Sequence, residues 1–301
     1  MKSPITRRSF LKTTTASLTL AVVSPRLFAA DGKVSTMVAT PRFRKAIMWD
    51  TISVKGSILE RMKAVRAAGF DGVEMASHLP QDEVLKARDE TGLEVTSVCG
   101  AKHWGKPLSH SDAAVRAEGL EALRQTLRDA KAYGAGSVLL VPGVVNKEVS
   151  IEECWKRSIE QIRQVIPQAR ESGVKISVEN VWNDFITTED QAVRYLDEIN
   201  SSWVGWHFDI GNIIRYGDPI QWIKTLCKRI NRVHIKEYSR DRAMRVGDVW
   251  KGFGTSLMEG ANNWPGIMKA FRETGYEGYL ITEQSGTPEE LSRGLDKIIA
   301  A

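Results

Sequence analysis

Short apolar runs alternate with longer segments of mixed polarity along most of the chain. Runs of the first kind are typical of buried strands, and segments of the second kind are typical of helices that cover a sheet. We expect strands over residues 44–49, 72–75, 93–99, 137–141, 174–179, 203–209, 230–235 and 278–283. We expect helices over residues 57–68, 81–90, 112–133, 151–171, 188–199, 219–228, 264–273 and 288–299.

Eight strands alternating with eight helices predict a single-domain α/β protein with the (β/α)8 TIM barrel fold over residues 43–301. Glycines end several of the expected helices, at Gly69, Gly92 and Gly134. The alternative is an open doubly wound sheet, but no glycine-rich phosphate loop follows a predicted strand. We expect an unusually long loop over residues 237–262, which would cover the mouth of the barrel and help to set specificity.

The N-terminus reads as an export signal rather than as part of the fold. Residues 6–12, TRRSFLK, match a twin-arginine signal, and an apolar segment follows over residues 16–30. That segment is interrupted and shorter than the roughly twenty residues that a membrane span needs. We therefore expect a signal over residues 1–30, a linker over 31–42, the twin-arginine export machinery as a partner and a periplasmic or exported location. An ordinary secretory signal or an uncleaved anchor are the alternatives.

Charge and cysteine content narrow the function classes. The formal net charge is +5, from 42 basic and 37 acidic residues. Residues 1–30 hold five basic residues and no acid, so the remainder has 37 of each sign. A neutral mature chain lacks the overall basic charge of a nucleic-acid binder, and we expect no nucleic-acid partner. The three cysteines are too few for a disulfide framework. Folding before export would also let the protein acquire a metal in the cytoplasm.

Four predicted strands end in groups that bind cations. These groups are Glu179, Asp209, His234 and Glu283. The carboxyl ends of barrel strands meet at one mouth, where the four side chains would converge. Two glutamates, one aspartate and one histidine suit a single divalent ion such as Mn²⁺, Mg²⁺, Co²⁺ or Zn²⁺. The sequence thus predicts a metal site at the mouth of the barrel.

The motifs around these groups resemble those of the xylose isomerase-like barrel superfamily, in particular its sugar phosphate isomerase/epimerase group. The resemblance extends over residues 45–300 and is carried by SVENVW, HFDIGN, VHIKEYSR and WPGIMKAFRETGYEGYLITEQ, in that order. It implies that Glu179, Asp209, His234 and Glu283 are the metal ligands, and that Glu179 and Glu283 exchange protons with the substrate. It also implies that Arg240 contacts substrate oxygens. The usual D-x-x-H pattern ends here in Asn212, which cannot carry a proton, so the substrate or the reaction type differs from the ketose epimerases.

The set allows isomerisation or epimerisation of a sugar next to a carbonyl group. A divalent ion would stabilise the enediolate that remains when a carboxylate removes a carbon-bound proton. The residues expected to contact the sugar are Glu74, His103, His207, Asn212, Lys236 and Arg240. A structural ion pair is the alternative role for Glu74, and a core histidine is the alternative for His207. Aromatic walls for the sugar are expected from Trp49, Trp104, Trp182 and Trp250, some of which core packing would claim.

Other functions remain open at this point. A metal-dependent lyase or dehydratase of an oxidised sugar or glycoside shares the first chemical step, and product mass separates the two reactions. A metal-dependent apurinic endonuclease of the same superfamily would need further histidines, one of them at Asn212, and a basic face. A non-catalytic sugar-binding protein would not require two proton-transfer carboxylates. The sugar, its phosphorylation, the native metal and a homo-oligomeric state are left undetermined.

Overall fold

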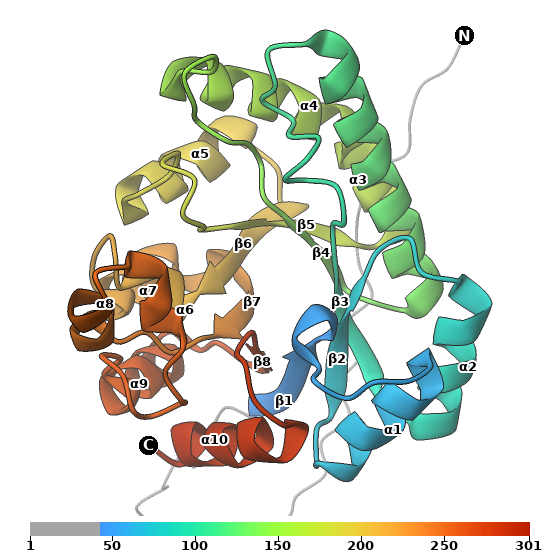
Figure 1. Ribbon diagram of the computed structural model, residues 1–301. Helices are drawn as coiled ribbons and strands as arrows, with labels where there is room; N and C mark the ends of the chain where they lie inside the picture. Colours follow the sequence, from blue (N-terminus) through green and yellow to red (C-terminus); the bar gives the residue numbers. More distant parts are fainter. Residues whose placement is uncertain (1–42) are drawn as a thin grey trace, which may run out of the picture. The chain divides into compact units, whose positions relative to one another are not determined.

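Eight parallel strands form a closed barrel in chain order (Figure 1). The computed structural model describes residues 43–301, and the predicted signal and linker lie outside them. β1 pairs with both β2 and β8, which closes the barrel and rejects the open-sheet alternative. The strands are β1 (Phe43–Met48), β2 (Gly72–Ala76), β3 (Glu94–Cys99), β4 (Ser137–Leu140), β5 (Lys175–Glu179), β6 (Val204–Asp209), β7 (Ile230–Ile235) and β8 (Gly278–Thr282).

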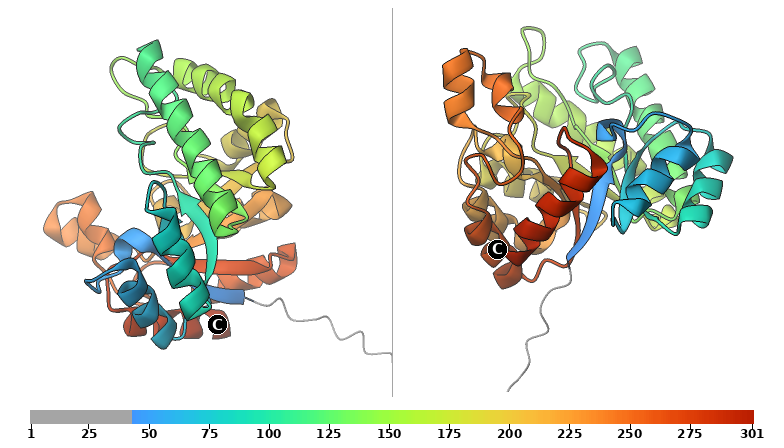
Figure 2. Two further views of the ribbon diagram at one scale, coloured as in Figure 1. Left: turned by 90° about the vertical axis from the view of Figure 1, so that its right-hand side faces the viewer. Right: turned by 60° about the horizontal axis from the view of Figure 1, so that its bottom comes forward.

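Helices surround the strands in all three views of the chain (Figure 2). The α-helices are α1 (Ile58–Ala67), α2 (Gln81–Thr91), α3 (Ala113–Tyr133), α4 (Ile151–Ser172), α5 (Glu189–Ile199), α6 (Ile210–Ile213), α7 (Pro219–Leu226), α8 (Arg240–Val246), α9 (Trp264–Thr274) and α10 (Pro288–Ala300). Three 3₁₀ turns join them: η1 (Trp49–Thr51), η2 (Cys227–Arg229) and η3 (Val249–Phe253). The (β/α)8 prediction is confirmed. Within residues 43–301 no helix has the length and apolarity needed to cross a membrane.

Local sequence signals fix where several helices begin and end. Ser57 accepts a hydrogen bond from the backbone of Glu60 at the start of α1, and the Glu60 side chain accepts one from the Ser57 backbone. Such a cap stabilises a helix by about 1 kcal/mol. α2 and α3 end at Gly92 and Gly134, whose φ angles of 65° and 77° favour glycine. The expected helix boundaries therefore lie within one or two residues of the observed ones.

β6 illustrates how the barrel separates its core from its site. Trp206 and Phe208 point outward, where Phe208 stacks on Trp222 of α7 and meets the edge of Phe271 of α9. Successive side chains of a strand point to opposite faces. His207 and Asp209 therefore point into the barrel, although both are fully buried. Because apolar side chains fill the layer between the strands and the helices, the inner face of the barrel can hold polar groups.

The residues after β7 differ from the expected long loop, because they include α8 and η3. Glu237 anchors this segment from a fully buried position. Its carboxylate accepts hydrogen bonds from the backbone of Met258 (3.0 Å) and Asn262 (3.3 Å) and from Trp264 Nε1 (2.8 Å). Gly260 passes so close that a Cβ atom there would lie 2.3 Å from Glu237 Oε1. Short helical turns of this kind lack the repeated apolar positions by which a helix is predicted.

Candidate metal centre

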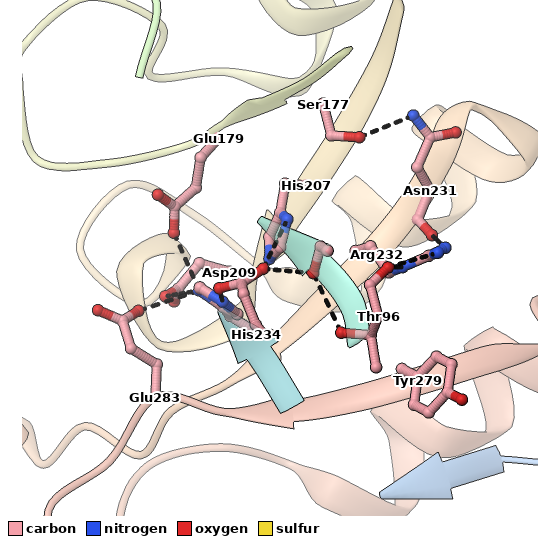
Figure 3. A network of polar contacts seen from close by, with 12 residues as sticks. Thr96, Ser177, Glu179, His207, Asp209, Asn231, Arg232, His234, Tyr279 and Glu283 are labelled. Carbon is pink, nitrogen blue, oxygen red and sulfur yellow. Dashed lines mark hydrogen bonds and ion pairs between the residues drawn. The ribbon is translucent and has the colours of Figure 1, made fainter. Parts of the chain in front are cut away.

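Four side chains from adjacent strand ends converge on one point inside the mouth (Figure 3). His234 Nδ1 lies 3.1 Å from Glu283 Oε2, 3.2 Å from Glu179 Oε1 and 3.8 Å from Asp209 Oδ2. The pairing of β6 with β7 sets Asp209 beside His234, which fixes two of the four groups relative to each other. One donor atom from each residue lies within 4.8 Å of all the others. We call these four residues the metal quartet.

The donor atoms of the metal quartet fit a divalent cation. Asp209 Oδ2 and Glu283 Oε2 are buried, and the cationic side chains beside them in the described part of the chain are Lys236 and His234. Lys236 Nζ supplies nearby positive charge, at 2.7 Å from Glu283 Oε2 and 3.2 Å from Asp209 Oδ2. Buried carboxylate oxygens need a cation or a donor to offset the loss of hydration. Three carboxylates and one imidazole nitrogen form a donor set that suits Mn²⁺, Mg²⁺, Co²⁺ or Zn²⁺.

The ionisation of the quartet reflects a shortage of positive charge. Burial raises the pKa of Asp209 to about 7, and the nearby acids add to the shift that Lys236 opposes. Burial also raises the pKa of Glu179. For Glu283 burial is outweighed by Lys236 and His234, which lower its pKa. For His234 burial is outweighed by Glu74 and by hydrogen bonds to the quartet acids, which raise its pKa. A divalent ion would favour the charged carboxylates further.

A second group of polar residues lies deeper in the barrel, beneath the metal quartet. Glu74 Oε1 lies 2.8 Å from His234 Nε2, and Ser97 Oγ donates to Glu74 Oε2 at 2.6 Å. His207 Nδ1 lies 3.9 Å from Glu74 Oε2. We call Glu74, Ser97 and His207 the lower cluster. With Nδ1 of His234 given to a metal ion, its Nε2 proton would be donated to Glu74, an arrangement that orients metal-binding histidines in many proteins.

Glu74 and His207, which were predicted to contact substrate, both lie in the lower cluster. Both are fully buried, and neither is among the described residues that line the cavity. The strand pairing is irregular at both positions, between Val73 and Glu74 and between Trp206 and His207. Such irregularities redirect side chains. Glu74 hydrogen-bonds His234, and the His207 ring packs on it, whereas their contact with substrate stays a prediction.

Ionisation also distinguishes the two members of the lower cluster. Burial alone would raise the pKa of Glu74, but His234, His207 and the Ser97 hydrogen bond outweigh it and lower the pKa to about 2. Burial, together with His234, lowers the pKa of His207 to about 3. Neither ring nitrogen of His207 has a hydrogen-bond partner among the described residues. Glu74 is therefore a fixed anion, and His207 is a neutral ring.

Above the metal quartet lies a cavity of about 360 Å³. Glu179, His234 and Glu283 form part of its lining. Three of the six residues expected to contact the sugar also line it: His103, Asn212 and Lys236. His103 Nδ1 accepts a hydrogen bond from the backbone of Val141, so the neutral ring presents its proton on Nε2. Burial lowers the pKa of His103 to about 4, which keeps the ring neutral.

Asn212 joins the metal quartet to the cavity wall through α6. The backbone N–H of Asn212 donates to Asp209 Oδ1 at 2.7 Å, which caps α6 and leaves Asp209 Oδ2 for the quartet. The Asn212 side chain donates to the backbone carbonyl of Asn180, and the backbone carbonyl of Asn212 accepts from Trp182 Nε1. Asn212 therefore braces the cavity wall, in addition to any contact with a substrate hydroxyl.

Arg240 lies at the start of α8. It is exposed and donates to the carbonyl of Ile214 at 2.7 Å. Within residues 43–301, it is not among the residues that line the cavity. Its contact with substrate stays a prediction.

Aromatic side chains form much of the remaining lining. Trp104, Trp182, Trp250 and Phe253 all contribute to the cavity. The fourth tryptophan expected there, Trp49, is buried instead, with the Arg61 guanidinium 3.6 Å from its ring centroid. Three of the four expected aromatic walls are thus present.

Sequence reasoning missed three residues that hold the site together. Ser97 fixes Glu74, as described above. Asn180 accepts from Trp206 Nε1 and from the backbone of Asp209, which ties β5 to β6. Gln284 accepts from the backbone of Glu237 and donates to the carbonyls of Phe253 and Thr255. Asn180 and Gln284 each follow a quartet glutamate directly, and this adjacency was the available signal.

Comparison with known proteins shows that the chain belongs to a known family and that several similar proteins are named as sugar epimerases. The family described as xylose isomerase-like TIM barrel matches residues 62–300. The L-ribulose-5-phosphate 3-epimerase of Escherichia coli K12 is 26% identical over 247 residues, which is 77% of this chain and 84% of the relative.

Two solved structures have the same fold. The 3-keto-D-glucoside 4-epimerase of E. coli is 18% identical with a TM-score of 0.74, covering 86% of this chain and all of its own. An L-ribulose 3-epimerase is 24% identical with a TM-score of 0.68, covering 85% of this chain and 86% of its own.

Proposed function

We propose that this chain, which belongs to the xylose isomerase-like TIM barrel family, is a divalent-metal-dependent epimerase or isomerase of a sugar that carries a carbonyl group. The observation that carries the proposal is the metal quartet at the inner end of a ligand-sized cavity. The relative and the two solved structures are sugar epimerases by name, which supports the same reaction class.

Glu179, Asp209, Glu283 and Nδ1 of His234 would hold the ion. When bound, the ion supplies positive charge that makes the hydrogen next to a substrate carbonyl easier to remove. Glu74 would keep the His234 ring in the orientation that presents Nδ1. Lys236, 2.7 Å from Glu283, would neutralise part of the carboxylate charge and donate a hydrogen bond to a substrate oxygen.

Glu179 and Glu283 would move the protons. Glu179 ends β5 and Glu283 follows β8. These strands stand three apart in the closed barrel, so the two carboxylates would approach a bound sugar from different sides. One carboxylate removes the hydrogen from the carbon next to the carbonyl, and the electron pair moves onto the carbonyl oxygen. The other carboxylic acid then delivers a proton to the opposite face of that carbon. The substrate keeps its composition, and the two glutamates exchange their protonation states.

Solvent exchange tests this proposal. Metal-loaded protein and a panel of keto-sugars are incubated in D₂O, and deuterium on carbon is measured by NMR. We expect Glu179→Gln and Glu283→Gln to reduce exchange at least about 100-fold, the usual contribution of a general base. Glu277→Gln is the control, because Glu277 is exposed and precedes β8 at the other end of the barrel. Exchange that persists in both active-site variants would contradict the proposal. A product lighter than the substrate by water or an aglycone would instead identify a lyase.

We also propose that the twin-arginine sequence exports the folded protein to the periplasm. The support is the TRRSFLK motif at residues 6–12. Cell fractionation of the full-length chain tests it, with the double variant Arg7→Lys, Arg8→Lys as the comparison. The wild-type chain should appear outside the cytoplasm and the variant should not. Equal distribution of both would reject twin-arginine export.

A further inference from the structure

We infer that the mouth of the cavity is an aromatic subsite for a ring linked to the reacting sugar, so that the substrate is an unphosphorylated keto-glycoside. This inference rests on the proposed function, whose reaction it keeps and whose substrate class it names. Its first basis is a pair of exposed tryptophans, Trp104 and Trp250, which line the cavity yet retain 51% and 59% of their accessible surface.

The two tryptophans lie on different segments at the mouth. Trp104 lies in the loop after β3, and Trp250 lies in η3 after β7, where its ring packs on Trp182. Both rings line the cavity and stay exposed, so each offers a flat apolar surface to a group that leaves the cavity. The apolar C–H face of a sugar ring, or an aromatic aglycone, packs well on such surfaces.

The wall that carries Trp250 is preformed. The Trp250 and Trp182 ring centroids are 4.7 Å apart, and Trp182 Nε1 donates to the carbonyl of Asn212 at 2.9 Å. Phe253 packs against Trp182 at 4.9 Å. The rings are already held in place, so ligand binding costs little side-chain conformational entropy. Exposed apolar surface that is held in place at a cavity mouth is typical of a binding site.

The size of the cavity places the reacting sugar and its substituent in different regions. Its volume of about 360 Å³ lies at the small end of the range for ligand pockets, roughly 300–1,000 Å³. One sugar unit fits against the metal quartet within that space. A ring attached to that unit has to lie farther out, at the level of the exposed tryptophans.

The charges around the cavity disfavour a phosphate group. Lys236 is the only lysine or arginine that lines the cavity within residues 43–301, and Glu283 and Asp209 already engage it. His103 is neutral, as described above. Phosphate binding in proteins relies on arginine, lysine or free backbone N–H groups at a helix N-terminus. The cavity offers none of the first two beyond Lys236.

Helix N-termini at the mouth do not supply the missing phosphate site. In (β/α)8 barrels that site commonly follows β7 and β8. Here α8 starts with its cap filled by Ser239. α10 starts with a capping box of Thr287 and Glu290 and has Glu289 in its first turn. Carboxylates at these positions repel a phosphate dianion.

The chemistry of a glycoside then defines its oxidation state. A sugar linked through its anomeric carbon has no carbonyl there, yet proton removal needs an adjacent carbonyl. One ring hydroxyl must therefore already be oxidised to a ketone, which requires an oxidoreductase as the preceding reaction. Epimerisation next to that ketone replaces one C–H bond with another on the opposite face, so atoms and electrons balance without a further reagent.

Binding measurements test the subsite without catalysis. Tryptophan fluorescence of the metal-loaded protein is titrated with cellobiose, lactose, phenyl β-D-glucoside and phenyl β-D-galactoside, and with glucose, galactose and their 6-phosphates. We expect at least one glycoside to bind about tenfold or more tightly than its free sugar, and the phosphates to gain nothing. Trp104→Ala and Trp250→Ala should each remove most of that advantage, and Trp104→Phe should retain it. Absence of a glycoside advantage, or its persistence in both alanine variants, overturns the inference.

Met244→Ala serves as the matched control. Met244 is 73% exposed on α8, close in sequence to Trp250, but is not among the residues that line the cavity in the described chain. Its replacement should leave binding unchanged. Thermal melts of each tryptophan variant establish that the fold is retained.

Kinetics on oxidised ligands separate the two proposals. Ketones prepared from the same disaccharides and free sugars are compared by solvent deuterium exchange with L-ribulose 5-phosphate. We expect the tryptophan variants to lower the ratio of kcat/KM for keto-glycoside over keto-sugar about tenfold. Exchange that favours the phosphate ester rejects the keto-glycoside but keeps the proposed reaction. Tryptophan-dependent glycoside binding without exchange on any ketone rejects the reaction but keeps the subsite.

Discussion

The metal quartet includes His234 and the lower cluster contacts it from below, yet the two groups differ in their balance of charge. In the quartet, three carboxylates face one lysine and one imidazole nitrogen, and burial raises the pKa of Asp209 to about 7. In the lower cluster, one carboxylate faces His234 Nε2 and Ser97, and its pKa falls to about 2. The first group has too little positive charge, whereas the second is balanced.

This difference indicates which of the two groups suits an ion. The quartet has three carboxylates beside one lysine and one imidazole nitrogen, and it opens into the cavity. The lower cluster is fully buried, and both oxygens of Glu74 already have partners. Buried carboxylates in excess of the nearby positive charge are costly unless a cation arrives. We therefore propose that the quartet binds the metal and that Glu74 orients His234.

Replacement by leucine should have very different effects at His234 and at His207, and the larger effect is expected at His234. The His207 and His234 ring centroids are only 4.1 Å apart. We expect His234→Leu to abolish stoichiometric metal binding, because a ligand is lost. Removing the partner of buried Glu74 should also destabilise the fold by about 3–5 kcal/mol. Metal content by mass spectrometry and denaturant unfolding measure the two effects. Full metal content in His234→Leu would overturn the assignment.

Glu74→Gln tests whether Glu74 orients His234, and its effect on metal binding should be intermediate in size. The amide keeps the shape of the side chain but loses the charge that orients His234 Nε2. We expect metal affinity to fall about 10–100-fold, as is usual for such partners of metal-binding histidines. Competition with a metal-sensitive dye measures it. Glu94→Gln on β3 is the control, since Glu94 is exposed and pairs with Arg44 away from the site. If Glu74→Gln binds the metal as tightly as the unchanged protein does, Glu74 has only a packing role.

Removal of the metal should lower stability by a smaller amount. An ion present at 100 times its Kd stabilises the native state by about 2.7 kcal/mol. For a chain of this size we expect a chelator to lower Tm by roughly 5–10 °C. Scanning calorimetry with and without EDTA measures the change. The effect should vanish in His234→Leu, and a chelator effect that persists there would point to an ion bound elsewhere.

His207→Leu should have the smallest effect. The ring is fully buried, and neither of its nitrogens has a partner in the described chain. Exchange of an unpartnered polar ring for an apolar side chain of similar volume should change the free energy of unfolding by less than about 1 kcal/mol. Metal content should not change. A loss of metal in this variant would show that His207 belongs to the metal site.

The strands, the helices and the members of the quartet could be predicted from the sequence. The strands and helices follow from the local pattern of apolar and polar residues, and the quartet follows from the positions of its members at strand ends. β7 was predicted with its observed bounds, Ile230–Ile235. Quartet residues stand at or just past strand ends, where the closed topology brings them together whatever the details of packing. Asp209 and Glu283 therefore lie at the mouth as expected.

The depth of a side chain inside the barrel could not be predicted in the same way. His207 and Asp209 share a face of β6, but two residues of a strand span roughly 6.6 Å, which moves His207 one layer below the mouth. Glu74 lies in the middle of β2 (Gly72–Ala76), not at its end. The irregular pairing at both positions leaves no trace in the sequence.

The buried carboxylate of Glu237 has a consequence for redesign. It accepts hydrogen bonds from Met258, Asn262 and Trp264, which hold the C-terminal end of the segment after β7 in place. Trp250 and Phe253 lie between Glu237 and Met258, whereas the metal quartet lies outside this segment, on or next to the strands. We therefore expect that libraries randomised over residues 240–256, with Glu237 and its three partners kept, would alter one wall of the cavity and leave the metal quartet in place.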